Sequence, residues 1–396
     1  MISRIDSILF CFLFSIVTFG ADRKVVLFSN DRNPKLNENA LSAENMIFEI
    51  RSIYNLNKKA LHLGRNSIID VRKGGLRNGT IIMASNTSII GDIENDESGT
   101  LKINVAGKNI NISDFRWNND NGVALQSFAD CSNLTISKCS MSSGIDNCVK
   151  IVADHLKGTI KGISFFDCDI SYKRMGIELQ NHGNDNYRFD GVVIRNCRFR
   201  QGNHESKYGY ALSLSGYGRN VVVDKNHFTE MPIGVEIVGF SNVVIRNNYF
   251  KNISTKTIVS SNKRKMAQIL VEKNQIDCPK SKIQLSNTDH FYFNNNDMTI
   301  SYLELIGCSN GDVSDNVINT NGHYAIIFDG SNKNCRNNVV NNNTIRQRGD
   351  NWAIFRCYGK YSVDNRFVKN TISRNNKRGV VFDQIKGSLN NLIIMK

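Results

Sequence analysis

Proline is almost absent from this sequence: 3 of its 396 residues are proline, and 29 are glycine. That composition excludes a collagen-like chain, which needs glycine at every third position, and argues against long disordered segments. The ten cysteines form no Cys-x-x-Cys pair and no His/Cys cluster, so we expect no zinc site. Nothing in the sequence indicates another metal or a cofactor, and we predict none.

Long apolar runs are also missing, with one exception at the start. Residues 1–21 are typical of a signal peptide: Arg4 supplies a positive charge, residues 8–17 are apolar, and Gly20 and Ala21 offer a cleavage site. The apolar stretch is short for a transmembrane span, although an uncleaved anchor is the alternative. We therefore predict a secreted or periplasmic protein, without stable membrane insertion after cleavage.

Acidic residues are the minority charge, with 36 Asp and Glu against 50 Lys and Arg, a formal net charge of +14. A basic exported protein suggests an acidic partner, and an anionic polysaccharide fits best. Export argues against a nucleic acid. The one dense basic run, residues 263–265, is of a kind that usually lies in a solvated turn. The oligomeric state is not predicted.

A repeat dominates the chain. Each member stands two residues before a hydrophobic residue and follows a short β-prone run, at spacings of 20 to 29 residues: Cys139, Cys168, Cys197, Asn226, Asn248, Asn274, Asn296, Asn316, Asn343 and Asn370. A strand-based repeat of this length indicates a solenoid with loop insertions. Stacked Asn side chains can hydrogen-bond to one another at a turn. We predict an all-β fold, a single-stranded right-handed parallel β-helix over residues 61–396.

The cysteines of this row should face the core. Removal of residues 1–21 leaves nine cysteines, and disulfides would be the default in an exported protein. Free cysteine, however, behaves as a small buried hydrophobe. We therefore expect Cys139, Cys168 and Cys197 to stack as thiols.

An N-terminal segment, residues 22–60, should precede the stack. Ser42 to Tyr54 has the pattern of a short amphipathic helix: Ser42 can cap it, and Met46, Ile50 and Ile53 fall on one face. Such a helix would cover the open end of the first coil. We predict that it caps the β-helix.

A second row of residues is expected to point outward. It is aligned on strands whose Val, Ile and Leu face inward, and it contains Lys150, Glu178, Ser213, Glu236, Val259, Gln284 and Glu304. Because side chains alternate along a strand, these residues should share one face, one per coil and about 4.8 Å apart.

Glu178 and Glu236 are the leading acid pair. Two coils apart, their backbones should be separated by about 9–10 Å. Flexible side chains would bring the carboxyl groups near the spacing of inverting glycosidases, where one acid protonates the leaving oxygen and the other activates water. The alternative is that both are solvated strand residues.

Two insertions, residues 181–188 and 201–210, flank this face and concentrate His, Tyr and charged residues, as binding loops do. A lyase needs a base and positive charge to stabilise the anion formed when a uronate loses its C5 proton. Lys150 and His182 are candidates for the proton transfer. Candidates for substrate contact are Arg174, Gln180, Asp185, Tyr187, Arg188, His204, Tyr208 and Ser213.

The repeat resembles the pectate-lyase-like β-helix superfamily over roughly residues 60–390, a superfamily of polysaccharide lyases, polygalacturonase-type hydrolases, epimerases and tailspikes. Residues 133–139 followed by 144–151 are similar to the polygalacturonase stretch with paired aspartates, but Asn147 stands beside Asp146 where a second Asp would be. The Gly-His-Gly and Arg-Ile-Lys signatures, a calcium-binding acid cluster and an Asp-Pro-His-Asp epimerase motif are missing.

The resemblance implies an enzyme that cleaves a long, acidic polysaccharide. Hydrolysis by Glu178 and Glu236 is our leading hypothesis, and β-elimination is the close alternative. A non-catalytic glycan-binding or surface protein is a third possibility, and an epimerase a fourth.

Overall fold

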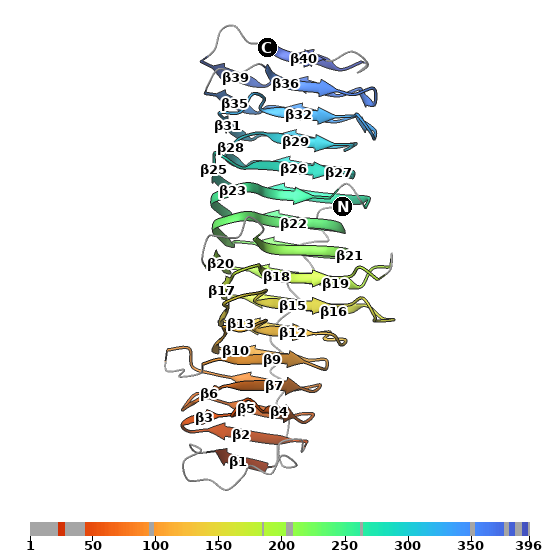
Figure 1. The fold of residues 1–396 in the computed structure, drawn as a ribbon. Helices are drawn as coiled ribbons and strands as arrows, with labels where there is room; N and C mark the ends of the chain where they lie inside the picture. Colours follow the sequence, from red (N-terminus) through yellow and green to blue (C-terminus); the bar gives the residue numbers. More distant parts are fainter. Residues whose placement is uncertain are drawn as a thin grey trace.

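The protein is a right-handed parallel β-solenoid of about 13 turns. The computed structural model describes residues 23–27, 44–94, 99–183, 186–202, 209–261, 264–348, 353–375, 380–384 and 390–394. Strands lie one above another as rungs along a single axis, from β2 near one end to β40 near the other (Figure 1). Every recorded strand pairing is parallel, and each coil pairs with the coils above and below it. The predicted fold class is thus confirmed for the solenoid.

Each coil crosses three parallel sheets, which we call A, B and C in chain order. Sheet A contains β1 (Arg23–Leu27), β2 (Met46–Ile50), β5 (Ile68–Asp70), β8 (Ser88–Ile90), β10 (Ile110–Ser113), β13 (Leu134–Ser137), β16 (Ile160–Phe166), β19 (Phe189–Arg195), β24 (Met266–Glu272), β27 (Thr288–Asn294), β30 (Asp312–Ser314), β34 (Val339–Asn341), β38 (Arg366–Val368) and β41 (Leu392–Ile394).

Sheet B contains β3 (Ile53–Asn55), β6 (Gly75–Arg77), β11 (Arg116–Asn119), β14 (Ser140–Ser143), β17 (Asp169–Tyr172), β20 (Arg198–Gln201), β25 (Gln275–Cys278), β28 (Asp297–Ile300), β31 (Val317–Thr320), β35 (Thr344–Gln347) and β39 (Thr371–Arg374). Sheet C contains β4 (Ala60–Leu63), β7 (Gly79–Met83), β9 (Leu101–Val105), β12 (Leu125–Ser127), β15 (Val149–Val152), β18 (Met175–Gln180), β26 (Lys282–Ser286), β29 (Leu303–Ile306), β32 (Ile326–Asp329), β36 (Ala353–Tyr358) and β40 (Val380–Gln384).

Three long strands turn the corners between sheets without a break: β21 (Tyr210–Asp224), β22 (His227–Arg246) and β23 (Tyr249–Ser260). Their register shifts at the corners, for example between Ser215 and Gly218. Two short strands, β33 (Cys335–Arg336) and β37 (Ser362–Val363), pair with each other between sheets C and A. The middle of the molecule is therefore the most continuously hydrogen-bonded part of the described chain.

The core is a column of inward side chains, which follows from strand alternation. In β22, Val235 and Ile237 are fully buried while Glu236 between them is only half-buried. Aromatic rings stack from coil to coil, as in Phe199, Phe228 and Phe250, whose successive centroids are 4.9 and 4.7 Å apart. That spacing equals the distance between adjacent strands, so the same ring packing repeats from coil to coil along the axis.

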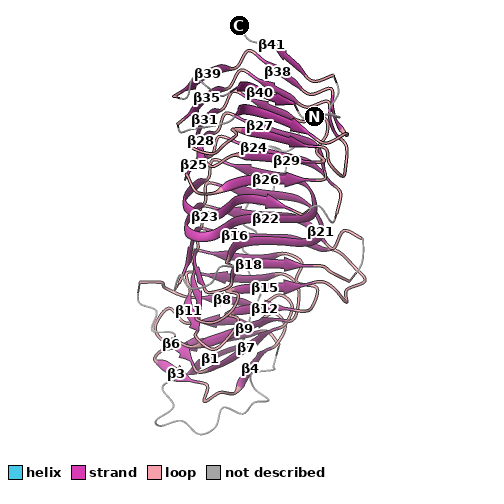
Figure 2. Ribbon diagram, turned by 45° about the horizontal axis from the view of Figure 1, so that its top comes forward, coloured by secondary structure: helices cyan, strands magenta, loops and turns pink. Residues whose placement is uncertain are grey.

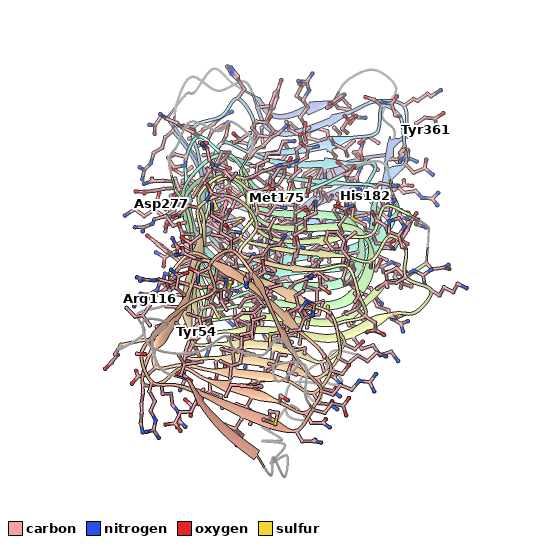
Figure 3. The ribbon with its side chains drawn as sticks, turned by 60° about the horizontal axis from the view of Figure 1, so that its bottom comes forward. Tyr54, Arg116, Met175, His182, Asp277 and Tyr361 are labelled. Carbon is pink, nitrogen blue, oxygen red and sulfur yellow. The ribbon has the colours of Figure 1, made fainter. Side chains whose placement is uncertain are left out.

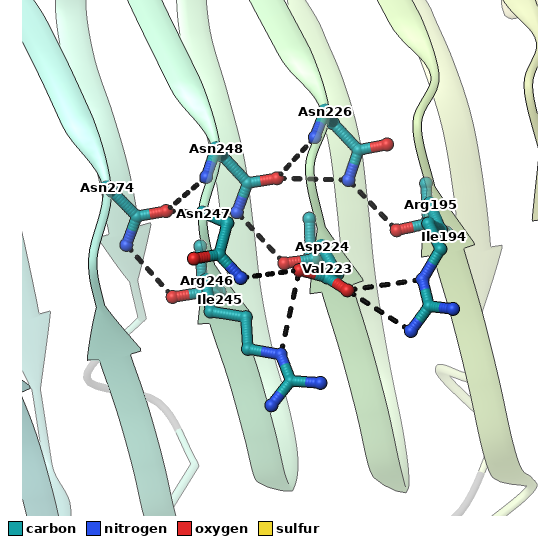
Figure 4. A network of polar contacts seen from close by, with 10 residues as sticks. All are labelled: Ile194, Arg195, Val223, Asp224, Asn226, Ile245, Arg246, Asn247, Asn248 and Asn274. Carbon is teal, nitrogen blue, oxygen red and sulfur yellow. Dashed lines mark hydrogen bonds and ion pairs between the residues drawn. The ribbon is translucent and has the colours of Figure 1, made fainter. Parts of the chain in front are cut away.

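The asparagine row of the sequence forms a buried ladder at the corner between sheets A and B (Figure 4). The backbone N–H and the side-chain Nδ2 of Asn226 both donate to Oδ1 of Asn248, at 2.8 and 3.0 Å. Asn248 donates in the same way to Asn274, and the pattern continues to Asn370. Each Nδ2 also donates to a core strand carbonyl, as Asn248 does to Val223. The ladder satisfies its own polar groups inside the core.

The left-handed backbone at this corner belongs to the residue before each ladder position. Lys225, Asn247 and Lys273 have φ values of 57°, 54° and 53°. The tight turn thus precedes the ladder Asn and aims its side chain inward.

Cysteine replaces asparagine in the lower coils. Cys139, Cys168 and Cys197 are buried and free, as are the six other cysteines among the described residues. Each of the three thiols lies within hydrogen-bonding distance of the backbone carbonyl two residues before it, such as Sγ of Cys168 and O of Phe166 at 3.1 Å. The prediction of stacked thiols is confirmed.

The predicted N-terminal capping helix is wrong. Within the predicted span, the described residues form strands β2 and β3 and no helix, and Figure 2 shows only strands and loops in the described chain. Met46, Phe48 and Ile50 alternate inward, and β2 pairs with β1 and β5. A period of two competes with the helical spacing in this run, and a neighbouring strand edge rewards the strand.

The solenoid consequently starts before residue 61. The predicted signal peptide and Ser42 lie outside the described residues. In the part of the chain that the structure describes, no helix has the length and hydrophobicity needed to cross a membrane.

Candidate active site

The row predicted from the sequence is one continuous column on sheet C, but the expected exposure is wrong for three of its members, because Glu178, Ser213 and Val259 are buried. Lys150 is the register partner of Glu178, Glu178 of Ser213, and Ser213 of Glu236. The column continues through Val259, Gln284 and Glu304. Glu178 and Glu236 are therefore two coils apart, as predicted, with their backbones separated by about 9.6 Å.

Glu178 lies at the lower end of the acid pair, with 7% of its surface exposed. Its Oε2 accepts a hydrogen bond of 2.7 Å from Nδ2 of Asn147, and Nζ of Lys150 is 3.6 Å from the same oxygen. Both neighbours stabilise a negative charge that burial would otherwise penalise. Oδ1 of Asn147 is buried and has no hydrogen-bond partner.

Glu236 has a different environment. Its Oε2 accepts a 2.7 Å hydrogen bond from the buried hydroxyl of Ser213. Burial raises the pKa of Glu236, and the negative charge of Glu178 raises it further, against the opposing effects of Ser213, Lys256 and His182. A raised pKa favours the protonated acid, which is the form that can donate a proton.

Cations border the upper side of Glu236. Lys256 and Lys282 are register partners at the start of the sheet C strands, and Nζ of Lys282 is 2.8 Å from Oε2 of Glu304. Burial lowers the pKa of Lys256, as does the charge of Lys282, while Glu304 and Glu236 raise it in part. Lys256 is therefore easier to deprotonate than an exposed lysine.

His182 and Gln180 lie at the other end of the strand. The His182 ring Nε2 is 2.7 Å from the hydroxyl of Ser215, and its backbone N–H donates to Asp154 at 2.7 Å. Nε2 of Gln180 donates to the second oxygen of Asp154, also at 2.7 Å. Asp154 thus fixes the corner that carries His182, which lies on the side of the molecule opposite Asp277 and Arg116 (Figure 3).

Other predicted contacts have different neighbours. Arg174 is exposed, with Asp146 as an ion-pair partner at 3.8 Å. The Arg188 guanidinium donates to the carbonyl oxygen of Lys157 at 2.7 Å, which secures the loop base. Tyr187 is exposed, and the guanidinium of Arg219 lies 5.6 Å from its ring centre. Asp185, His204 and Tyr208 lie outside the described residues.

Three contributors were missed as site residues: Asn147, Asp154 and Lys256. The signal for Asn147 was present, because it stands at a position where the resembling hydrolases have an acid, and it turns out to bind the neighbouring coil's carboxylate. Asp154 stands two residues after the end of β15 and accepts hydrogen bonds from the Gln180 side chain and the His182 backbone N–H of the next coil. Lys256 lies within β23, beside the register shift between Lys256 and Ile258, where alternation alone does not fix the direction of a side chain.

The arrangement suits proton transfer at two points on one face. It offers a carboxylate held by a cation and an amide, and a second carboxyl with a raised pKa. Among the described residues, no three His, Cys, Asp or Glu side chains are grouped so that they could hold a metal ion.

A family model described as a right handed beta helix region matches residues 159–298, a span that contains both acids. No curated protein matches the sequence. Among solved structures, a surface adhesin of Streptococcus pneumoniae, PfbA, is 15% identical, with a TM-score of 0.41 over 88% of this chain and 82% of that one.

Two modules of Azotobacter vinelandii mannuronan C-5 epimerases are also similar. The AlgE6 A-module is 11% identical, with a TM-score of 0.40 over 82% of this chain and 90% of that one. The AlgE4 A-module is 10% identical, with a TM-score of 0.37 over 90% and 92%. At such identities, no role of a residue carries over from these proteins.

Proposed function

We propose that this parallel β-solenoid, with two interacting carboxyl groups on one face, is an exported enzyme that hydrolyses a long, acidic polysaccharide. The observation that supports this most directly is the asymmetry of the pair. Glu236 has a raised pKa, partly through the charge of Glu178, whereas Glu178 is next to Lys150 and Asn147.

The asymmetry assigns the roles. Glu236, as the protonated acid, donates its proton to the oxygen of the leaving sugar. Glu178, as the carboxylate, takes a proton from a water molecule that attacks the anomeric carbon on the opposite face. Ser213 lies between the two acids and orients Glu236 through its hydroxyl. A spacing of two coils leaves room for the water, which favours inversion of configuration.

β-Elimination is the second candidate, and Lys256 favours it. A lysine whose pKa is lowered by burial and by Lys282 can act as the base that removes the C5 proton of a uronate. Arg174 and Arg188 are less suited to stabilising the resulting anion, since they contact Asp146 and a backbone carbonyl.

The test is incubation of the protein with a panel of acidic and neutral polysaccharides, following reducing ends and the ultraviolet absorbance of unsaturated uronates together. Glu178→Gln and Glu236→Gln are the test variants, and Glu272→Gln, on sheet A, is the matched control. We expect new reducing ends without a rise in absorbance. This activity should be lost in both test variants and kept in the control.

Absorbance that rises with the reducing ends and disappears in Lys256→Met would replace hydrolysis with elimination. Binding without any product, unchanged in both Glu variants, would reject an enzyme in favour of a glycan-binding surface protein.

A further inference from the structure

A pocket of about 510 Å³ lies away from the acid pair, at the corner between sheets C and A. Its lining comes from five consecutive coils, represented by Lys265, Asn287, Gly307, Lys333 and Tyr361. Five coils correspond to about 19 Å along the axis. Lys265 belongs to the same coil as Val259, which is the register partner of Glu236. The pocket, which we call the corner groove, therefore begins one coil above the acid pair.

The corner groove is positively charged. Lys265, Lys333 and Arg336 line it, and Asp289 is the one acid among its lining residues. Asp289 already accepts a 2.8 Å hydrogen bond from Asn310 and is 3.3 Å from His290. The lining therefore keeps an excess of two positive charges, which attracts anions.

Neighbouring residues position the main chain at Lys265 and the side-chain stem of Lys333. Lys265 follows Arg264, whose guanidinium lies 4.1 Å from the ring centre of Tyr217 and which donates to a backbone carbonyl in the coils below. Gly307 has a φ of 59°, and a Cβ at this position would come within 2.6 Å of Cβ of Lys333. The stem of Lys333 thus passes directly over Gly307, a close approach that only glycine permits.

The remaining lining suits a sugar chain. Asn287, Asn332 and Asn334 present amides that can donate to and accept from hydroxyl groups. Tyr361 is 38% exposed at the edge of the groove, and Nζ of Lys360 lies 4.7 Å from its ring centre, which adds a cation beside the aromatic surface. Tyr361 and His182 lie toward the same side of the molecule (Figure 3).

We propose that the corner groove is a second, non-catalytic site that binds the carboxylate groups of an acidic polysaccharide. Arg336 pairs with carboxylates by its planar fork, and the two lysines act as point charges. The groove holds a polymer segment beyond the acid pair, which keeps a long chain attached to the protein. The substrate class rests on the proposed function, but binding in the groove does not require cleavage.

The probe is polygalacturonate, with neutral dextran as the comparison, and binding is measured by calorimetry and affinity electrophoresis. We expect Lys333→Gln/Arg336→Gln to lower the affinity for polygalacturonate about tenfold, which corresponds to about 1.4 kcal/mol. Cleavage of a short oligosaccharide should not change. Lys251→Gln/Lys280→Gln, which removes two exposed cations outside the groove, is the matched control and should bind like the unaltered protein.

Glu178→Gln/Glu236→Gln separates the two proposals. If it keeps its affinity while the groove variant loses affinity, the groove binds the polymer, whether or not any polysaccharide is cleaved. If the folded groove variant binds polygalacturonate as tightly as the unaltered protein, or if dextran binds equally well, the inference is overturned.

Discussion

Two rows of polar residues, the asparagine ladder and the sheet C column, run along this solenoid with one residue per coil. They differ in their hydrogen bonding and in their charge. In the asparagine ladder, each side chain donates to the next coil and to a core carbonyl, so the row is closed and buried. In the column of Glu178, Ser213 and Glu236, neighbouring residues differ, charges interact, and the pKa of Glu236 is raised. In the ladder, the same residue recurs in each coil and stabilises the fold. In the column, different residues occupy equivalent positions in successive coils and form a candidate site.

The largest expected effect is on activity. Replacing Glu236 by Gln removes the proton donor while keeping the size of the side chain, and we expect the rate to fall by about 10²- to 10⁴-fold. Asn248→Asp, at the ladder, should leave the rate of any correctly folded fraction unchanged. Initial rates on the cleaved polysaccharide provide the measurement, and a Glu236→Gln rate within twofold of normal would refute the role of this column.

The next effect is on stability and comes from the ladder. Asn248→Ala deprives Asn226 of its acceptor and the carbonyl of Val223 of its donor, so we expect a loss of about 3 kcal/mol in the free energy of unfolding. Cys168→Ala removes a thiol with weaker bonds and should cost about 1 kcal/mol. Denaturant titration gives both values. Equal losses would show that the asparagine hydrogen bonds stabilise the fold no more than the cysteine thiols do.

A smaller effect is the pH dependence of stability at Glu236. Its pKa is raised in the folded protein, so the protonated form stabilises the native state below the unfolded pKa of about 4.3, and this contribution is lost as the pH rises through the folded pKa. Glu236→Gln should therefore gain stability relative to the unaltered protein as the pH rises from about 4.3 upward.

Melting temperatures across that range provide the measurement. Ser213→Ala removes a hydrogen bond to the charged form of Glu236, so it should steepen the fall in melting temperature with rising pH. Parallel stability curves for the unaltered protein and Glu236→Gln would contradict the raised pKa.

The smallest effect belongs to charges that lie outside both rows. Arg198 and Asp169 form an exposed ion pair with a distance of 2.5 Å, and Arg198→Gln should change the free energy of unfolding by less than about 1 kcal/mol because water screens the pair. High salt should reduce even this difference. A loss as large as that of Asn248→Ala would show that an exposed ion pair stabilises the fold as much as the buried ladder does.

The sequence alone predicted the solenoid and the register of its outward column, because strand alternation and spacing determine both. Lys150, Glu178, Ser213 and Glu236 are paired as expected. The N-terminal strand β2 was missed because Met46, Phe48 and Ile50 alternate in a run that also fits helical spacing, and only a neighbouring coil decides between the two.

The candidate site was less predictable than the fold. Asn147 comes from the corner before β15, and Lys256 stands beside a register shift within β23. At both places backbone geometry rather than alternation directs the side chain. The raised pKa of Glu236 depends on burial and on Glu178, neither of which can be read from a residue type. Arg188 has the right chemistry for a substrate contact, but in the structure it donates to the backbone of Lys157, in the loop of the neighbouring coil.

The coil that carries Ser213 separates the two acids, and this has a consequence for how such a site can change in evolution. In a solenoid, an insertion within a loop leaves the strand register unchanged, whereas a change in the number of strands between two positions must add or remove a complete coil. The distance between the two carboxyl-bearing backbones can therefore change only in increments of about 4.8 Å. Loss of one coil would place the acids on adjacent strands, so a single in-frame deletion could alter the stereochemistry of the reaction without any substitution at the acids themselves.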